Sequence, residues 1–384
     1  MLRHGTVAAP MSSDDQPRIS RSTMQVAIDV GPLYGHRSGV GVAVDGMLDG
    51  LRRHDEVHLD QYLVSSRSTP EPGHRRLPIP GIVASHLWAR TGHPKADRWL
   101  AGVDVVHGTN YTAPPSSVPT VISVYDCWFL AHPADARPIV RRAGDQLRRS
   151  IDAGAWVHTS SEATATAART LLDTDRVVAV PLGPPPTPSP PSGPPQRLTM
   201  LGGKRFVLAI GTEERRKDLR LLVESFEILL ADHADVRLVL AGAPGDDTDR
   251  ITRAVSALPD SAADRIHRLG VIDDTEKAWL LQHAAVLAYP SLDEGFGFPI
   301  LEAQASGTPV VAFSVGSIPE VAGDAAVLVG DRDPIRFADA LGRTLGDDRP
   351  DLVESGRRNV ARFSWERCAD GLVSLYRNAL EAQR

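Results

Sequence analysis

The amino-acid sequence predicts an α/β protein built from two Rossmann-like domains that face each other across a cleft. Three observations predict this architecture. Short runs rich in Val and Ile alternate with segments of helical periodicity in both halves of the chain. A strand, a glycine-containing loop and a helix open the first half, and a proline-rich segment separates the two halves. The length of 384 residues suits two domains.

The composition excludes several classes of protein. Apolar residues make up 42% of the chain and charged residues 23%, which is typical of a soluble globular protein. The net charge of −6 argues against a protein that binds nucleic acid through bulk charge. No apolar run approaches the roughly 18 residues of a membrane span. With only two cysteines, Cys127 and Cys368, a disulfide framework is excluded, so we expect a reducing, cytoplasmic compartment.

Residues 1–23 lack the apolar core of a secretory signal. We expect them to form a disordered extension, and Met1, Met11 and Met24 all remain candidate start residues.

The first domain is expected over residues 24–183. Residues 24–30 predict a strand, 31–41 a glycine-containing loop and 42–51 a helix with apolar residues at helical spacing. Continuous apolar runs of this length are typical of strands buried in a parallel sheet. Such runs occupy residues 103–106, 118–124, 155–159 and 177–180, and a helix is predicted over 139–153.

Nine of the fifteen residues from 181 to 195 are proline. Proline fixes φ and lacks a backbone N–H, so this composition excludes a helix or a central strand and predicts a stiff, extended spacer. We place the linker at residues 184–203.

The second domain is expected over residues 204–364, followed by a final helix over 365–384. The alternation of apolar strands with helices predicts a second parallel sheet with right-handed crossovers. Its six strands are predicted over residues 205–210, 236–241, 266–269, 285–289, 310–312 and 326–328, and its helices over 219–230, 248–258, 275–284, 299–306 and 334–345.

Ligands of parallel α/β sheets bind where strands end and helices begin. The turn after the strand at 285–289 reads YPSLDEGFGFPILEA over residues 289–303. Gly295 and Gly297 allow a close approach of backbone to ligand, and free amides near Phe298 form an anion site at the helix start. Glu294 and Glu302 frame this loop with carboxylates, which accept hydrogen bonds from sugar hydroxyls.

The turn after the strand at 205–210 carries Arg216 and Lys217 side by side. A forked guanidinium and a compact ammonium together suit a diphosphate and stabilise charge on a departing phosphate. Lysine is rare in this chain, where 38 of the 42 basic residues are arginine, and that rarity favours a functional Lys217 over a solvated charge run.

The loop at residues 38–41 reads SGVG, and the backbone of Gly39 and Gly41 is available for a phosphate or sugar contact. The dinucleotide-binding fingerprint G-x-G-x-x-G fails because Val44 stands at the third glycine position. This failure disfavours a nicotinamide-dependent oxidoreductase.

These motifs resemble family 4 of the retaining glycosyltransferases, which have the GT-B fold. EGFGFPILEA over 294–303 resembles the family's E-x7-E motif, and GTEERRKDL over 211–219 resembles its Arg-Lys phosphate site. ASGTPVVAF over 305–313 and GSIPEVAGDAAVLV over 316–329 are similar to the segments that follow. The resemblance extends from about Met24 to the C-terminus and is most specific over 205–330.

The resemblance implies a nucleotide-sugar donor site in the second domain. Glu302 would hold the ribose hydroxyls, and Arg216 and Lys217 would neutralise the leaving diphosphate. Glu294 would hold the donor sugar together with four backbone amides, and the two glycines of the first domain would approach the phosphates on closure. The amides belong to Gly295, Phe296, Gly297 and Phe298, and the glycines are Gly39 and Gly41. The final helix would cross back and pack on the first domain.

One position departs from the family pattern. Tyr125, just before Asp126 at a strand end, stands where the family usually has a His that contacts the donor sugar. Tyrosine donates a hydrogen bond but carries no positive charge near pH 7. His107 and Asn110 lie at another strand end and are candidates to substitute, although each is more often a structural residue. The alternative function is therefore a non-catalytic nucleotide-sugar-binding protein with a degenerate site.

No metal or other cofactor is expected, because the Arg-Lys pair supplies the positive charge that a metal would bring. Three D-x-D triplets are interpreted as solvated turn residues rather than metal ligands. They are Asp173/Asp175, Asp247/Asp249 and Asp331/Asp333.

The sequence thus predicts a retaining hexosyltransferase that uses a GDP- or UDP-hexose and a glycan or lipid-linked acceptor, with no role for nucleic acid. The RRKDL variant resembles mannosyl-transferring relatives that use GDP-mannose, and this resemblance favours mannose as the sugar. The helix at 139–153 carries four arginines beside apolar residues, so it is interpreted either as an ordinary surface helix or as a peripheral contact with the inner face of a membrane.

Overall fold

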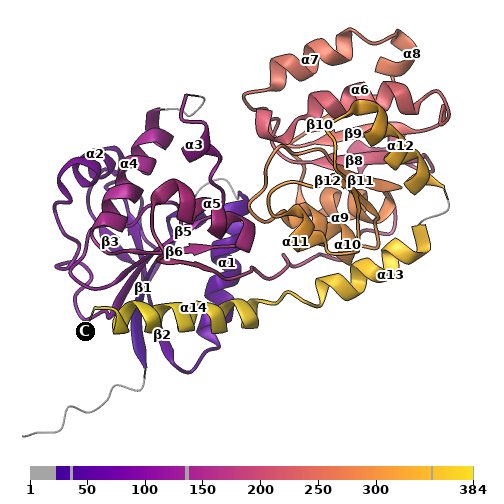
Figure 1. The fold of residues 1–384 in the computed structure, drawn as a ribbon. Coiled ribbons are helices and arrows are strands. Elements are labelled where there is room, and N and C mark those ends of the chain that lie inside the picture. Colours follow the sequence, from indigo (N-terminus) through magenta and orange to yellow (C-terminus); the bar gives the residue numbers. More distant parts are fainter. Residues whose placement is uncertain (1–22, 35–37, 135–137, 347–348, 384) are drawn as a thin grey trace, which may run out of the picture.

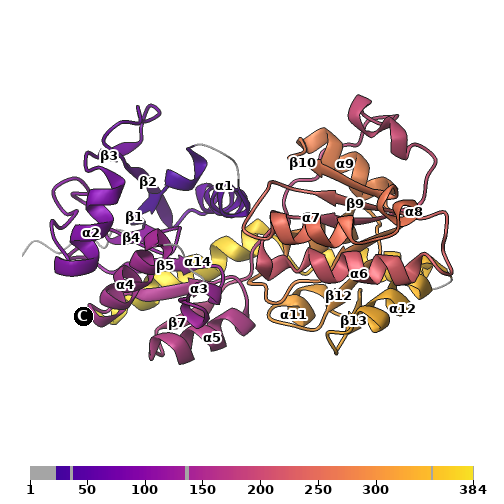
Figure 2. The ribbon, with the colours of Figure 1, turned by 90° about the horizontal axis from the view of Figure 1, so that it is seen from above.

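The computed structural model describes residues 23–34, 38–134, 138–346 and 349–383, so the predicted extension at 1–23 lies outside the described residues except for Thr23. Two parallel sheets, each covered by helices, form two domains that lie side by side (Figures 1 and 2). The predicted fold class, two Rossmann-like domains with a final helix that returns to the first domain, is confirmed.

The first sheet has seven strands in the order β3-β2-β1-β4-β5-β6-β7. Five were predicted: β1 (Met24–Asp29), β4 (Val105–Gly108), β5 (Thr120–Val124), β6 (Trp156–Thr159) and β7 (Val177–Ala179). Two were missed, namely β2 (Val57–Val64) and β3 (Arg75–Leu77). They lie at one edge of the sheet and include charged and partly exposed residues, so they lack the continuous apolar run of a central strand.

The helices of the first domain are α1 (Gly39–Arg52), α2 (Gly81–Thr91), α3 (Trp128–Ala131), α4 (Pro138–Asp152) and α5 (Glu162–Leu172). The expectation of a loop through residue 41 was wrong, because α1 already begins at Gly39. Ser38 caps this helix, and its Oγ accepts a hydrogen bond of 3.4 Å from the backbone N–H of Gly41.

The second sheet has six strands, as predicted, in the order β10-β9-β8-β11-β12-β13. They are β8 (Phe206–Ile210), β9 (Arg237–Ala241), β10 (Ile266–Gly270), β11 (Val286–Tyr289), β12 (Val310–Phe313) and β13 (Val327–Val329). Around them lie α6 (Leu219–Leu229), α7 (Thr248–Ser256), α8 (Asp260–Ala263), α9 (Asp274–His283), α10 (Phe298–Ala305), α11 (Ile318–Ala322), α12 (Pro334–Leu345) and α13 (Arg349–Val360).

The proline-rich segment contains neither helix nor strand from residue 181 to 195. A 3-10 helix, Gln196–Leu201, then follows within the predicted linker. Its Leu198 and Leu201 are buried against the core of the second domain, so this part of the linker packs on that domain.

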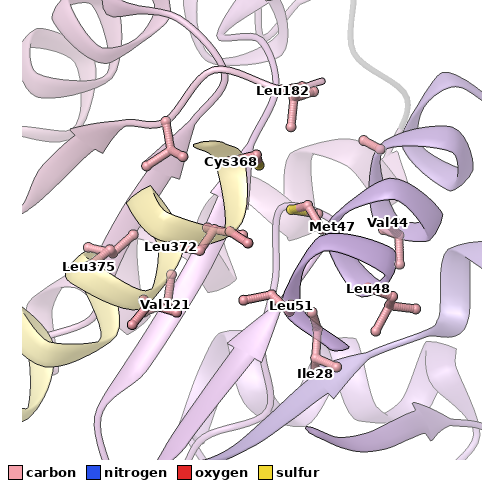
Figure 3. Packing of buried hydrophobic residues seen from close by; sticks show 14 of the residues in the cluster. Ile28, Val44, Met47, Leu48, Leu51, Val121, Leu182, Cys368, Leu372 and Leu375 are labelled. Atoms are coloured by element: carbon pink, nitrogen blue, oxygen red, sulfur yellow. The ribbon is translucent and has the colours of Figure 1, made fainter. Parts of the chain in front are cut away.

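The last helix, α14 (Trp365–Glu381), runs from the second domain back across the first (Figure 1). Its apolar face joins the core formed by α1 and the first sheet. Figure 3 shows Cys368 and Leu372 of α14 on the side that faces Met47 of α1. The first domain is therefore completed by the C-terminal segment of the chain.

Trp365 at the start of α14 fits between two glycines. A Cβ on Gly46 of α1 would lie 2.2 Å from the Trp365 ring, and one on Gly183 would lie 2.6 Å from the Trp365 backbone nitrogen. The indole N–H donates a hydrogen bond of 2.9 Å to the carbonyl oxygen of Pro184. Because neither glycine carries a side chain, α14 can pack closely against α1 and the start of the linker.

Candidate functional site

The candidate site lies at the carboxyl ends of two adjacent parallel strands. β8 and β11 pair in register, with Val207 beside Val286. The turn after β8 carries Arg216 and Lys217, and the turn after β11 carries Glu294. The two turns are also joined through the backbone, because the N–H of Leu292 donates a hydrogen bond of 2.7 Å to the carbonyl oxygen of Arg216.

Glu294 is 6% exposed and contacts both cationic side chains. Its Oε2 lies 3.0 Å from Nη1 of Arg216, and its Oε1 contacts Nζ of Lys217 and accepts a hydrogen bond of 2.7 Å from Ser291. Burial alone would raise the pKa of Glu294, but the charges of Lys217 and Arg216 outweigh it and lower the pKa to about 2. Glu294 is therefore a fixed anion.

The two cations are largely enclosed. Nζ of Lys217 also donates a hydrogen bond of 3.1 Å to the hydroxyl of Tyr289, and Nη1 of Arg216 donates one of 3.0 Å to the carbonyl oxygen of Asp293. Burial lowers the pKa of Lys217, with Glu294 opposing this effect. For Arg216, burial is outweighed by Glu294 and by Asp126 of the first domain, so its pKa is raised.

The turn that carries Arg216 and Lys217 is braced by the neighbouring loop after β9. The N–H of Glu213 donates to the carbonyl oxygen of Ala243 at 2.9 Å, and the buried Glu213 carboxylate pairs with Arg268 through contacts of 3.0 and 2.6 Å. A Cβ on Gly245 would lie 2.5 Å from the carbonyl oxygen of Glu213. This close backbone packing holds the cationic turn in place.

Glu302, in α10, lies on the other side of the loop. Its Oε1 contacts Nζ of Lys277 from α9, while its Oε2 is buried and has no hydrogen-bond partner among the described residues. Sequence reasoning missed Lys277. The signal that could have found it is the rarity of lysine, because Lys277 is one of four in the chain.

A shallow pocket opens between the ends of β8 and β11. Its lining is mostly apolar and includes Leu219 and Ala288, and Gly211, Lys217, Tyr289 and Ser291 also border it. The pocket therefore adjoins the Arg216–Lys217–Glu294 cluster, where a negatively charged group would meet two cations.

The first domain covers the β11–α10 loop. A Cβ on Gly295 would lie 1.4 Å from the carbonyl oxygen of Tyr125, so the backbones of the two domains touch at this glycine. Gly297 has φ of 95° and precedes the first residue of α10, Phe298. The left-handed φ turns the chain sharply into the helix and favours glycine there.

The Phe296 and Phe298 side chains pack at the domain junction, where their ring centroids lie 5.4 Å apart. Phe296 also meets Phe363, and Phe298 meets Trp365 at the start of α14. These two side chains connect the loop to Phe363 and to the start of α14. Because the side chains are used in packing, the backbone amides of the loop remain the candidates for binding a ligand.

Asp126 follows β5 and lies near Arg216, whose pKa it raises. The Asp126 carboxylate accepts a hydrogen bond of 3.0 Å from the Tyr111 hydroxyl and one of 3.1 Å from the N–H of Trp128. The structure thus brings Asp126 of the first domain towards the cationic turn of the second.

The side chain of Tyr125 does not face the site. Its hydroxyl oxygen is buried and has no well-aligned hydrogen-bond partner among the described residues. Burial raises the pKa of Tyr125; the nearby Ser123 hydroxyl opposes this effect, while Cys368 of α14 and Asp29 of β1 raise the pKa further. The Tyr125 hydroxyl thus lies in the core of the first domain beside α14, and the Tyr125 backbone meets the β11–α10 loop at Gly295.

The structure places His107 in a buried hydrogen-bond network inside the first domain, which favours the structural interpretation of this residue. It is fully buried, with Nδ1 2.8 Å from the Tyr376 hydroxyl and Nε2 2.9 Å from Ser123 Oγ. Ser123 Oγ is in turn 2.8 Å from Nδ1 of His158. The network ties α14 to the first sheet and occupies both ring nitrogens of His107. Asn110, by contrast, is exposed after β4.

The remaining predicted residues fall in the first turn of a helix or in loops. Gly39 and Gly41 occupy the first turn of α1, and a Cβ on Gly39 would meet nothing within 4 Å. Among the D-x-D residues, Asp247 is not solvated as expected: it is 2% exposed and lies 3.2 Å from Arg250.

Two Rossmann-like domains with a cationic turn facing a carboxylate-framed helix start define the class of GT-B glycosyltransferases. The sequence profile described as "Glycosyl transferases group 1" matches residues 204–347. The D-inositol 3-phosphate glycosyltransferase of Geodermatophilus obscurus is 30% identical over 392 residues, which cover 94% of this chain and 80% of that protein. The chain belongs to the group 1 glycosyltransferase family.

Other similar proteins are also glycosyltransferases or share this fold. The O-antigen chain mannosyltransferase B of Escherichia coli is 29% identical over 301 residues, covering 74% of this chain and 78% of the relative. Among solved structures, a sucrose-phosphate synthase of Thermosynechococcus elongatus matches with a TM-score of 0.71 and 20% identity, covering 94% of this chain and all of that one. WaaG, a glycosyltransferase involved in lipopolysaccharide biosynthesis, matches with a TM-score of 0.65 and 14% identity over 90% and 97% of the two chains.

Proposed function

We propose that this glycosyltransferase transfers a hexose from a nucleotide sugar to an acceptor hydroxyl with retention of the anomeric configuration. The observation that carries the proposal is the cluster of Arg216, Lys217 and Glu294 at the carboxyl ends of β8 and β11. It combines two enclosed cations with one fixed anion beside a pocket. Such a cluster suits a molecule with a diphosphate at one end and hydroxyl groups at the other.

The donor diphosphate competes with Glu294 for the two cations. Arg216 and Lys217 then stabilise the charge that develops on the phosphate as the bond to the sugar breaks. Glu294, relieved of one partner, accepts hydrogen bonds from sugar hydroxyls, while Glu302 accepts them from the ribose. The cationic pair supplies the charge that a metal would otherwise bring, so the proposed reaction is independent of metal.

The character of Glu294 supports the proposal of retention. A carboxylate with a pKa of about 2 and two cationic partners is a weak base and a weak nucleophile. We therefore assign it to binding the sugar, and the leaving phosphate to accepting the proton of the acceptor hydroxyl on the same face of the sugar ring. The C–O bond to phosphate breaks, the bond to the acceptor oxygen forms, and the proton moves to the phosphate oxygen.

Mannose is the proposed sugar and GDP-mannose the first donor to test, with UDP-hexoses next. The RRKDL segment and the mannosyltransferase among the relatives support this choice. The acceptor is proposed to be a glycan or a lipid-linked sugar, and D-inositol 3-phosphate belongs in the same acceptor panel because several relatives bear its name.

The experiment is a thermal-shift panel of GDP- and UDP-sugars, followed by transfer and donor-hydrolysis assays with the donor that stabilises the protein most. Nuclear magnetic resonance of the product gives its anomeric configuration. We expect stabilisation by one nucleotide class, turnover without added metal and a retained configuration. Stabilisation without turnover on any acceptor favours a non-catalytic binding protein, and an inverted product contradicts the mechanism.

A peripheral membrane contact is a second proposal and rests on neighbouring helices of the first domain. α2 packs on α4, and together they expose Ile82 (65%), Val83, Leu87 and Ile139. Three of the four α4 arginines already have hydrogen-bond partners within the protein. Arg142 bonds to His86, Arg148 donates to the carbonyl oxygen of Leu171, and Arg149 donates to the carbonyl oxygens of Ala89 and Arg90. The exposed apolar side chains therefore carry this proposal.

No helix among the described residues is long and apolar enough to cross a bilayer. The expected contact is therefore a surface one. Cosedimentation with vesicles rich in anionic lipid checks it, and Ile82→Glu combined with Ile139→Glu should reduce binding severalfold. Equal binding by the variant and the parent protein contradicts the proposal.

A further inference from the structure

Two lysine–glutamate pairs flank Tyr289 at the end of β11. Lys217 contacts both Glu294 and the Tyr289 hydroxyl, and Lys277 contacts Glu302. Burial raises the pKa of the Tyr289 hydroxyl, and both glutamates raise it further, so both carboxylates lie near this phenol. Two of the four lysines in the chain are therefore committed to carboxylates around one tyrosine.

The two pairs differ in how fully the carboxylate is used. Both oxygens of Glu294 have partners, whereas only Oε1 of Glu302 does. Glu302 is 6% exposed, and its Oε2 is buried with no hydrogen-bond partner among the described residues. An unpaired buried carboxylate oxygen is costly to leave without a donor. It therefore points to a hydroxyl-bearing ligand that supplies the missing hydrogen bond.

Lys277 is held in place by the start of its helix. Asp273 and Glu276 form a reciprocal capping box at the N-terminus of α9, with hydrogen bonds of 2.8 and 3.1 Å. The buried Glu276 also pairs with Arg197 of the 3-10 helix at 3.1 Å. The residue that follows this fixed turn is Lys277, whose side chain is 30% exposed.

We propose that Lys277 is a positioning residue for the nucleotide: it holds Oε1 of Glu302 so that Oε2 faces a ribose hydroxyl of the donor and accepts its hydrogen bond. This inference rests on the proposed function, because it takes the ligand to be a nucleotide sugar. Lys277 itself acts through Glu302, since an ammonium fixed on one oxygen leaves the other oriented for the ligand. Because Oε2 is covered in this structure, the covering groups must move when the ligand enters.

The experiment compares Lys277→Met with the parent protein by calorimetric titration of three ligands. These are UDP or GDP, whichever binds the parent more tightly, the matching 2′,3′-dideoxynucleoside diphosphate, and inorganic pyrophosphate. Lys95→Met is the matched control, because Lys95 lies in the first domain and contacts Ser117 at 3.0 Å. Thermal melting of each variant verifies that it is folded.

We expect Lys277→Met to weaken binding of the ribonucleotide about tenfold, which is the usual effect of one hydrogen bond to a charged group. Binding of the dideoxynucleotide and of pyrophosphate should change less than about twofold. Lys277→Arg should restore most of the affinity. In turnover, Lys277→Met should raise the KM for the donor and leave kcat within about twofold, because the diphosphate contacts remain.

Equal weakening of the ribonucleotide and the dideoxynucleotide overturns the inference, because the lysine would then act without the ribose hydroxyls. Unchanged ribonucleotide binding by Lys277→Met overturns it as well. A parent protein that binds neither UDP nor GDP overturns the proposed function itself, so the two failures are distinguishable.

Discussion

The hydroxyl of Ser160, in the first domain, donates a hydrogen bond of 3.0 Å to the carbonyl oxygen of Gly295, in the β11–α10 loop of the second. Thr164 donates to the same oxygen at 3.3 Å. The Glu320 carboxylate of α11 accepts the N–H groups of Glu162 at 2.9 Å and Ala163 at 3.2 Å, at the start of α5. The first domain thus closes directly on the loop that carries Glu294.

Removing these contacts should favour an open arrangement. Ser160→Ala combined with Glu320→Gln removes one neutral hydrogen bond and weakens a charged one, which together cost about 2 kcal/mol of closure energy. Small-angle X-ray scattering should show a larger radius of gyration, and kcat/KM should fall severalfold. Thr170→Ala, on the exposed side of α5, is the control. Scattering identical to that of the control contradicts this role.

Gly295→Ala should block closure sterically. The new Cβ would lie 1.4 Å from the carbonyl oxygen of Tyr125, so the domains must separate or the loop must shift. We expect at least a tenfold loss of transfer with nucleotide binding retained, because the second domain holds the proposed donor site. Gly330→Ala is the control, since a Cβ there meets nothing within 4 Å. Full transfer by Gly295→Ala would show that the contact is dispensable.

Gly46→Ala should loosen the docking of α14. Its Cβ would come within 2.2 Å of the Trp365 ring, and overpacking of this kind costs about 1–3 kcal/mol. Urea unfolding followed by tryptophan fluorescence measures the loss. Gly81→Ala at the first position of α2 has free space and should leave the stability nearly unchanged. Equal midpoints for the two variants would contradict the packing account.

Stability should fall as the pH decreases from about 6.5 towards 4. Burial lowers the pKa of His158 to about 4 and lowers that of His107, so the folded state keeps both rings neutral where the unfolded chain binds protons. The stabilisation is present above the unfolded pKa and is lost as the pH falls through this window. For His158 it amounts to about 3 kcal/mol.

Urea midpoints at pH 7.5 and 5 measure this loss, with His158→Gln as the comparison. Asp29 acts in the opposite direction, because burial raises its pKa to about 6, so the difference between the two proteins isolates the histidine. If the urea midpoint of His158→Gln falls between pH 7.5 and 5 as much as that of the parent protein, His158 does not cause the loss.

Much of the fold could be predicted because its central strands are continuous apolar runs and its helices begin at proline, glycine or a capping residue. The turn from Tyr289 to Phe298 was predictable for the same reason, since an apolar strand ends at Tyr289 and Gly297 and Pro299 mark the start of the next helix. The partly charged strand β2, which lies second from the edge of its sheet, has no such pattern, and it was missed.

Only those parts of the site that consist of residues close together in the sequence could be predicted. Lys277 meets Glu302 through folding of two separate helices, and no local pattern announces that pair. The inward orientation of Tyr125 depends on α14, which comes from the far end of the chain. Long-range packing of this kind sets which residues at a strand end face the ligand.

In the proposed reaction, Lys217 and Arg216 carry the charge of the leaving diphosphate. The most direct test is the transfer rate of Lys217→Ala at saturating donor, against Lys204→Ala, which alters an exposed lysine. We expect a rate at least about a hundredfold lower for Lys217→Ala, with a folded protein by thermal melting, because removing one preorganised charge-stabilising donor costs that much. A rate near that of Lys204→Ala would contradict it.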